Sequence, residues 1–189
     1  MPHVLVPLAQ GCEELEAVTI IDLLRRADIK VTTAGLDKGP VTASRGTVLL
    51  PDAALEQLMD QDFDMIVLPG GLPGATHLDG DPRIHRLLTR QAEQGRYNAA
   101  ICAAPKVLAN AGLLDGRRAT SYPGALTNDD FPSVQLVDGP VVVDGKLVTS
   151  RGPGTAMDFA LELFELLVGR DRRVEVESKL MRPASTHPG

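Results

Sequence analysis

The sequence contains only two cysteines, Cys12 and Cys102, among its 189 residues. Two thiols cannot form the disulfide framework of a small secreted domain, so we expect a cytoplasmic protein with reduced thiols. No apolar run approaches the roughly 18 residues of a membrane span. The first residues also lack the basic segment and the cleavage site of a signal peptide. We therefore expect neither a membrane segment nor a secretion signal.

An excess of basic charge is also missing. The chain has 19 Lys and Arg against 25 Asp and Glu, a net charge of −6 and an isoelectric point near 5.2. Binding to nucleic acid or to anionic membranes needs basic patches, so neither is expected as a main task. A small anionic substrate held by one or two arginines stays compatible with this charge. The hydrophobic fraction of 43% is enough for one domain over residues 1–189 without disulfides or metals.

Two cofactor-binding motifs are absent. A dinucleotide fingerprint needs several glycines after the first strand, and only Gly11 is present there. The glycine-rich stretch Gly70–Gly74 lacks the Lys-Ser/Thr ending of a phosphate-binding loop. The sequence therefore predicts no nucleotide cofactor.

A metal site is not predicted either. The alternating aspartates Asp60, Asp62 and Asp64 resemble a calcium loop, but Met65 and Gly71 stand where that loop needs glycine and glutamate. None of the histidines has metal-ligand spacing with the cysteines. These histidines are His3, His77, His85 and His187. His77 to Asp79 lies upstream of Cys102, and an exposed turn is its favoured interpretation over a catalytic pair.

Apolar runs with the period of strands alternate with runs that have the period of helices. Predicted strands are His3–Leu8, Ile29–Gly35, Phe63–Leu68 and Asn98–Ile101, followed by a hairpin of Val141–Val143 and Leu147–Thr149. Predicted helices are Cys12–Ala27, Arg83–Gln94, Pro105–Ala111, Gly154–Val168 and Arg170–Met181, before a frayed tail over Arg182–Gly189. In the helix 154–168, the predicted inner face consists of Met157, Leu161, Phe164 and Leu167. This alternation predicts a mostly parallel sheet with helices on both faces, which binds ligands at the carboxyl ends of its strands.

Cys102 ends a predicted strand and precedes a predicted helix, with alanines on either side. A residue at such a turn presents its side chain to the crevice, as the serine elbow of hydrolases does. Pro105 follows where a first helical turn tolerates proline. The start of a helix favours anions, which would lower the pKa of the thiol toward neutrality. A buried, inert cysteine is an equally supported alternative.

The first predicted helix supplies a candidate partner for this thiol. Its apolar stripe consists of Ile20, Leu23, Leu24 and Ala27. Glu16 falls on the same stripe, and a carboxyl that faces a core tends to stay protonated. Such a group could donate a hydrogen bond to a thiolate. Glu13 projects to nearly the same side, so spacing does not choose between the two glutamates. Both could also be exposed residues that complement the helix dipole.

Four motifs carry a resemblance to a known family. They are Gly11-Cys12-Glu13-Glu14-Leu15-Glu16, Leu68-Pro69-Gly70-Gly71, Ala100-Ile101-Cys102-Ala103-Ala104-Pro105 and Ser150-Arg151-Gly152-Pro153-Gly154-Thr155. In this order the sequence resembles the ThiJ/PfpI superfamily, from about Val4 to Val168. It is most similar to the parkinsonism-associated protein deglycase branch, with its bacterial YajL-like relatives. The resemblance implies a flavodoxin-like three-layer α/β sandwich, usually a homodimer, without a cofactor.

The resemblance also assigns roles to residues. It implies that Cys102 is the reactive cysteine at the elbow and that Glu16, rather than Glu13, is its protonated partner. It further implies that the backbone amides of Gly71 and Ala103 form an anion or oxyanion site. By the same resemblance Gly70, Arg45 and Pro153 belong to the pocket, and Arg26 lies near the dimer interface.

The sequence departs from some relatives beside the pocket. Ser121-Tyr122-Pro123 stands where some relatives have a Thr-His-Pro stretch, and Tyr122 is a poor base at neutral pH. Tyr122 could donate a hydrogen bond or shape the pocket, which weakens any mechanism that needs a histidine. Leu72 replaces a polar residue of some relatives. Cys12 could act as a resolving thiol, although a small packed residue is the favoured interpretation.

Two functions are predicted for this site. One is an enzyme without cofactor or metal, of the deglycase or glutathione-independent glyoxalase type, that acts on small aldehydes or early glycation adducts. The other is an oxidative-stress sensor or redox-regulated chaperone that uses oxidation of Cys102. Both use the same thiol, and the first is preferred.

Overall fold

A seven-stranded sheet forms the centre of the computed structural model, which describes residues 1–182. Its strands, in spatial order, are β10 (Val141–Asp144), β11 (Leu147–Ser150), β7 (Tyr97–Ile101), β6 (Met65–Leu68), β1 (His3–Leu8), β2 (Lys30–Gly35) and β5 (Ala53–Ala54). Neighbouring strands are parallel except β10, which pairs antiparallel with β11. All parallel strands therefore end at one edge of the sheet.

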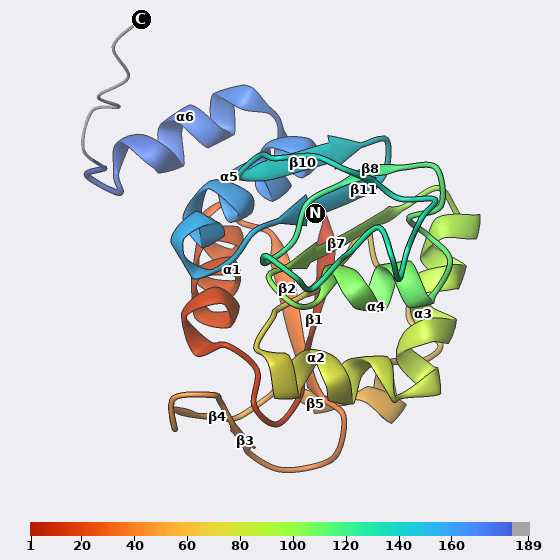
Figure 1. Cartoon of the computed structure of the whole chain (residues 1–189). Coiled ribbons are helices and arrows are strands. Elements are labelled where there is room, and N and C mark those ends of the chain that lie inside the picture. The colour runs from red at the N-terminus through yellow and green to blue at the C-terminus, as the bar shows by residue number, and fades with distance from the viewer. Residues whose placement is uncertain (183–189) are drawn as a thin grey trace, which may run out of the picture.

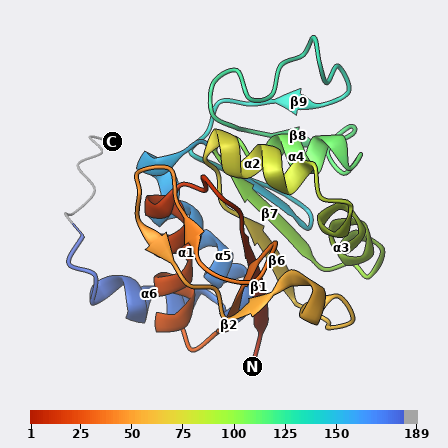
Figure 2. The ribbon, with the colours of Figure 1, turned by 90° about the horizontal axis from the view of Figure 1, so that it is seen from below.

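Helices cover both faces of this sheet (Figure 1, Figure 2). One face carries α1 (Glu14–Arg26) and α5 (Ala156–Val168), and α6 (Arg170–Ser178) packs against α5. The other face carries α2 (Leu72–Asp79), α3 (Pro82–Glu93) and α4 (Pro105–Asn110). Short elements complete the chain: 3-10 turns at Leu55–Leu58 and Pro153–Thr155, and the pairs β3 (Val41–Thr42) with β4 (Val48–Leu49) and β8 (Arg118–Ala119) with β9 (Gln135–Leu136). The predicted three-layer α/β architecture is confirmed.

The central strands are apolar on both sides because both faces of the sheet are covered. In β1, Val4 and Val6 belong to the core under α1 and α5, while Leu5 belongs to the core under α2, α3 and α4. All three side chains are fully buried. The alternation along a strand thus feeds two separate cores, one in each gap between sheet and helices.

The predicted strands and helices are found within a few residues of their expected bounds, but three details were wrong. The helix α2 was not predicted, and His77 lies in its last turn rather than in a bare turn. Met157 is 39% exposed, because the buried face of α5 is made by other residues. The last helix ends at Ser178 rather than at Met181.

The predicted tail at 182–189 lies outside the described residues except for Arg182. The side chain of Arg182 pairs with Asp158 and Glu177. Within residues 1–182, no helix combines the length and the apolar character needed to cross a membrane.

Candidate active site

The candidate site lies where β7 ends and the chain turns toward α4. Cys102 has a φ of +63°, a left-handed conformation that is costly for a residue other than glycine. Two backbone hydrogen bonds hold it there. The Cys102 N–H donates to the Ser150 carbonyl at 3.0 Å, and the Tyr122 N–H donates to the Cys102 carbonyl at 2.9 Å. The predicted elbow is therefore a real feature of the backbone.

Glu16 is the carboxyl that the fold brings to this elbow. Its side chain is fully buried in the first turn of α1, and Oε2 accepts a 2.7 Å hydrogen bond from the Gly70 N–H. Oε1 is also buried, and no hydrogen bond to it is found among residues 1–182. Glu13 instead accepts a hydrogen bond from the Ser44 hydroxyl at 2.8 Å. The structure thus separates the two glutamates that spacing could not separate.

Gly70 allows the carboxyl and the thiol to meet. A Cβ at this position would lie 2.5 Å from the Cβ of Cys102 and 2.6 Å from Oε2 of Glu16. Real Cβ atoms do not approach other atoms so closely, so only glycine fits between these two side chains. The reason is close approach of the backbone rather than a special φ at this residue.

Gly71 has a different constraint. Its φ is +86°, and a Cβ there would lie 2.5 Å from the Gly11 carbonyl oxygen and 2.6 Å from the Glu13 nitrogen. The loop after β6 is therefore pressed against the loop after β1. The Glu13 N–H donates to the Gly70 carbonyl at 2.9 Å and closes this contact.

The site contains two ionisable groups, the Glu16 carboxyl and the Cys102 thiol, and the negative charge of Glu16 disfavours the thiolate of Cys102. Burial raises the pKa of Glu16 to about 7, and the hydrogen bond from Gly70 opposes this rise. Burial, and next the charge of Glu16, raise the pKa of Cys102 to about 11. The prediction that the helix start lowers the thiol pKa was therefore wrong in direction. Hydrogen bonds from the Gly71 and Ala103 amides pull this pKa down but do not outweigh burial.

The pair titrates as one unit. Between about pH 7 and pH 11 it carries one negative charge and keeps one proton. The amides of Gly71 and Ala103 point at the sulfur, so they stabilise the charge when it resides there. The thiol keeps this proton because its pKa is the higher of the two, so in this range Glu16 is a carboxylate beside a thiol and not the protonated partner that the resemblance implied.

An open cleft of about 540 Å³ adjoins the elbow. Tyr122 and Pro153 are among its lining residues. Gly152 joins the cleft to the thiol, because a Cβ on Gly152 would lie 4.0 Å from Cys102 Sγ and 3.4 Å from the Tyr122 ring. Tyr122 is half exposed and contributes its ring to the wall of the cleft.

The two arginines singled out from the sequence lie at a distance from this cleft. Arg45 is exposed in the turn between β3 and β4, and its backbone N–H donates to Glu14 at 3.0 Å. Arg26 lies in the last turn of α1, where its side chain pairs with Asp22 at 2.6 Å. Neither arginine is among the residues that line the cleft.

Cys12 lies at the carboxyl edge too, but its surroundings differ. The side chain is fully buried in the apolar core beneath α1. Burial, and next the charge of Glu14, raise its pKa to about 11. This placement favours the interpretation of Cys12 as a small packed residue.

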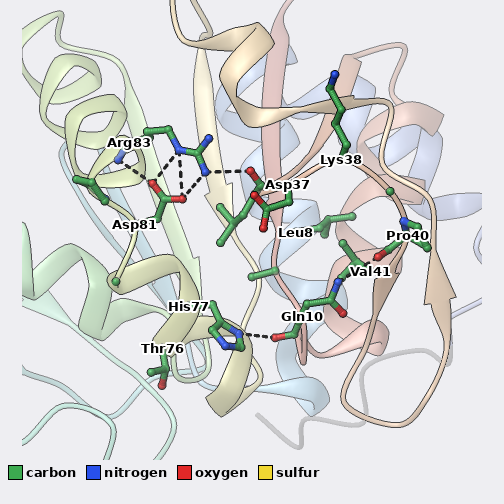
Figure 3. A pocket seen from close by; sticks show the side chains of 15 residues that line it. Leu8, Gln10, Asp37, Lys38, Pro40, Val41, Thr76, His77, Asp81 and Arg83 are labelled. Atoms are coloured by element: carbon green, nitrogen blue, oxygen red, sulfur yellow. Dashed lines mark hydrogen bonds and ion pairs between the residues drawn. The ribbon is translucent and has the colours of Figure 1, made fainter.

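A larger cavity of about 660 Å³ was not predicted from the sequence (Figure 3). It opens between the end of β1, the segment 36–41 and the junction of α2 and α3. The ring of His77 is hydrogen-bonded to the Gln10 carbonyl at 2.9 Å, and Arg83 is bound to Asp81. The unpredicted helix α2 forms one wall, which explains why the sequence gave no signal for it. Across residues 1–182, no three His, Cys, Asp or Glu side chains cluster as a metal would require.

The fold and the site together define a class: three-layer α/β proteins with a cysteine at a strand-to-helix elbow and a buried carboxyl beside it. Residues 2–166 match the DJ-1/PfpI family, and the chain belongs to this family. Its flavodoxin-like fold is confirmed by the solved structures that it matches.

Three relatives illustrate the similarity. Protein dj-1beta of Drosophila melanogaster is 46% identical over 178 residues, which cover 94% of this chain and 95% of that protein. The crystal structure of Drosophila DJ-1beta matches with a TM-score of 0.92 and 44% identity, over 97% of this chain and 99% of that one. The glutathione-independent glyoxalase DJR-1.2 of Caenorhabditis elegans is 35% identical over 86% of this chain and 87% of that protein. The structure of oxidized Toxoplasma gondii DJ-1 matches with a TM-score of 0.90 and 36% identity, over 97% and 100%.

Proposed function

We propose that this protein is a cofactor-independent cysteine enzyme that acts on reactive carbonyl compounds, with hydration of methylglyoxal or glyoxal as its glyoxalase-type reaction. One observation carries the proposal: the Cys102 thiol and the buried Glu16 carboxyl lie side by side, since a Cβ on Gly70 would contact both of them. A buried carboxylate beside a thiol is placed to act as its base. The worm relative named as a glyoxalase supports the same reaction class.

The chemistry follows from these positions. Glu16 takes the thiol proton, and the sulfur of Cys102 adds to the aldehyde carbon of methylglyoxal. The amides of Gly71 and Ala103 stabilise the oxyanion that forms on the former carbonyl oxygen. Glu16 returns the thiol proton to this oxyanion, which gives a hemithioacetal, and becomes a carboxylate again. It then takes the proton from the former aldehyde carbon and delivers it to the neighbouring carbon, while the hydroxyl proton passes to the neighbouring oxygen, which leaves a lactoyl thioester. Water hydrolyses the thioester, so methylglyoxal and one water become lactic acid and the thiol returns.

The finer assignments rest on the sequence resemblance. We propose deglycation of early protein glycation adducts, a hydrolase reaction, as a second use of the same thiol, and a place in the parkinsonism-associated deglycase branch. The site would include Gly70, Tyr122 and Pro153 as pocket residues. A cytoplasmic location fits the two reduced thiols. The YajL-like placement stays a prediction.

A homodimer is proposed on a specific surface. Leu15 and Val18 on the outer side of α1, with Val48 and Leu50 at the β3–β4 hairpin, expose 46–79% of their area. Val18 and Leu50 line one shallow cavity, so the two elements form a continuous apolar face. Such a face is typical of an interface between subunits. Arg26 lies on the same helix as Leu15 and Val18.

The alternative function uses the same groups. The amides and the carboxyl that would hold an oxyanion would equally hold a Cys102 sulfinate, formed by peroxide, and a partner could read that state. The solved structure of oxidized Toxoplasma gondii DJ-1 supports this sensor or redox-regulated chaperone. Peroxide treatment followed by mass spectrometry tests it, and a folded protein whose Cys102 gains no oxygen would exclude the sensor.

The deciding experiment measures D- and L-lactate formed from methylglyoxal without glutathione. Wild type should turn over, whereas Cys102→Ala and Glu16→Gln should lose at least about a hundredfold in kcat/KM. Circular dichroism verifies that each variant is folded. Turnover retained in Cys102→Ala, or absent in folded wild type, would refute the enzyme.

A further inference from the structure

Arg151 lies next to the reactive thiol by strand register. The parallel strands β11 and β7 place Ser150 opposite Ile101, so the following residues, Arg151 and Cys102, leave the sheet side by side. The Cys102 N–H donates to the Ser150 carbonyl and fixes this alignment. Arg151 lines the cleft that adjoins the thiol. Its guanidinium is the cation of that cleft, since Asp138 is the other charged lining residue.

The guanidinium already holds a carboxylate. Arg151 Nη1 lies 2.5 Å from Oδ1 of Asp138 in the ion pair between them. The Asp138 side chain is 90% exposed, whereas that of Arg151 is 41% exposed. An ion pair this open to water stabilises little and exchanges readily. Asp138 is therefore a replaceable occupant of a position that suits a carboxylate group.

The cleft has more room than a three-carbon aldehyde fills. Its volume of about 540 Å³ is in the range of pockets that take drug-sized ligands. Half of the remaining lining residues are Tyr122 and three prolines, at Pro123, Pro140 and Pro153. This wall favours an apolar body between the reacting carbonyl and a charged end.

We infer that Arg151 determines specificity by binding a substrate carboxylate in place of Asp138, so that the site prefers carbonyl compounds that carry a carboxylate beyond the reacting carbon. Arg151 is a binding residue in this scheme and takes no part in proton transfer. The claim about a substrate rests on the proposed function. The preference for a negatively charged compound is a property of the thiol and its cleft and does not depend on turnover. It can therefore be measured without turnover.

The test compares alkylation of Cys102 by iodoacetate and by iodoacetamide. In both reactions the sulfur forms a bond to carbon and iodide leaves, so the two reagents differ in the charge of the attached group. We define the ratio as the rate constant for iodoacetate divided by that for iodoacetamide, both measured by peptide mass spectrometry at pH 8. This ratio should fall about threefold to fivefold in Arg151→Gln, because the variant loses the cation that attracts the carboxylate of iodoacetate. Asp138→Asn, which frees the guanidinium, should raise the ratio by a similar factor.

Matched controls remove the same charges elsewhere. Arg117→Gln removes an exposed arginine that pairs with Asp144 at the opposite end of the β10–β11 hairpin. Asp60→Asn removes an exposed acid before β6, at the amino edge of the sheet. Neither control should change the ratio. The inference is overturned if the ratios in Arg151→Gln and Asp138→Asn both stay within about 1.5-fold of wild type, which is a small effect for exposed charges. If Arg151→Gln does not fold, Asp138→Asn alone decides.

A kinetic arm separates this inference from the proposed function. Arg151→Gln should lower kcat/KM for 4-carboxyphenylglyoxal about fivefold more than kcat/KM for phenylglyoxal. Equal effects on both compounds would argue against carboxylate recognition while the enzyme proposal stands. No turnover of either compound by wild type would refute the enzyme, and the alkylation ratios would still decide the role of Arg151.

Discussion

The two cysteines have similar positions in the sequence but different environments in the folded protein. Each follows a parallel strand of the sheet and precedes a helix, and burial raises the pKa of each thiol to about 11. Cys12 has a negative φ and is sealed in the core, whereas Cys102 is left-handed and partly exposed. A helix start therefore does not by itself lower the pKa of a thiol. The left-handed turn, two amides aimed at the sulfur and the adjacent carboxyl of Glu16 distinguish Cys102.

The largest expected contrast between the two thiols is accessibility. Iodoacetamide should alkylate Cys102 in folded wild type at least about a thousandfold faster than Cys12, because a sealed thiol reacts only when the core opens. Peptide mass spectrometry at several times measures both rates in one sample. In urea the two rates should converge. Comparable rates in the folded protein would contradict the burial of Cys12.

Of the two cysteines, Gly70→Ala should disturb only Cys102. The added methyl would overlap the Cβ of Cys102 and Oε2 of Glu16, so these two side chains must separate. We expect a loss of about tenfold to a hundredfold in methylglyoxal turnover and about 2 to 3 kcal/mol in unfolding free energy. Gly80→Ala is the control, since its φ is −75° and its nearest neighbour would lie 3.4 Å away. Equal effects of both substitutions would show that the close approach at Gly70 is unimportant.

Glu16→Gln sharpens the contrast through pH. The pKa of Glu16 rises from 4.5 to about 7 on folding, so between these pH values the folded chain holds a proton that the unfolded chain has released. Stability of wild type should therefore fall as pH rises through this window. Glutamine removes the cost, so the variant should exceed wild type by about 2 to 3 kcal/mol at pH 8 and by little at pH 4.5.

Urea unfolding at pH 5 and pH 8 measures this difference. The same variant should lower the pKa of Cys102, read from thiolate absorbance, since the charge of Glu16 is the second cause of its rise. The pKa of Cys12 should change less, because Glu16 is the last of its causes. A stability difference that is equal at both pH values would disprove the buried charge.

Cys12→Ala should give the smallest effect. Loss of a buried sulfur costs about 1 kcal/mol, and lactate formation should stay within about twofold of wild type. Unfolding by urea and the lactate assay measure the two quantities. A Cys12–Cys102 disulfide in wild type after peroxide would instead support a resolving thiol and contradict simple packing.

Much of the fold was predictable because hydrophobic period reports burial directly. The strand His3–Leu8 was predicted with its observed bounds, since both faces of β1 are covered and the run is continuously apolar. The helix α2 was missed because its glycine and proline conceal the period. The inner face predicted for α5 was wrong at Met157 for a different reason. The residues buried in α5 include Phe159, Ala160 and Leu163, so its buried face is rotated away from Met157.

The site was less predictable than the fold. Position at the edge suggested Cys102, but only the resemblance chose Glu16 over Glu13, and the side-chain contacts now explain that choice. The direction of the thiol pKa was wrong because the sequence gives the helix start but not the depth of burial. The role of Gly70 depends on distances between three loops, which no local pattern contains.

The left-handed backbone at Cys102 sets the preference of the backbone against the chemistry of the side chain. Glycine adopts a φ of +63° at no steric cost, whereas a residue with a side chain costs about 1 kcal/mol there. Replacement of Cys102 by glycine would therefore relax the turn and remove the thiol in one step. The residue that suits this turn best is the one that could present no thiol at the carboxyl edge of the sheet.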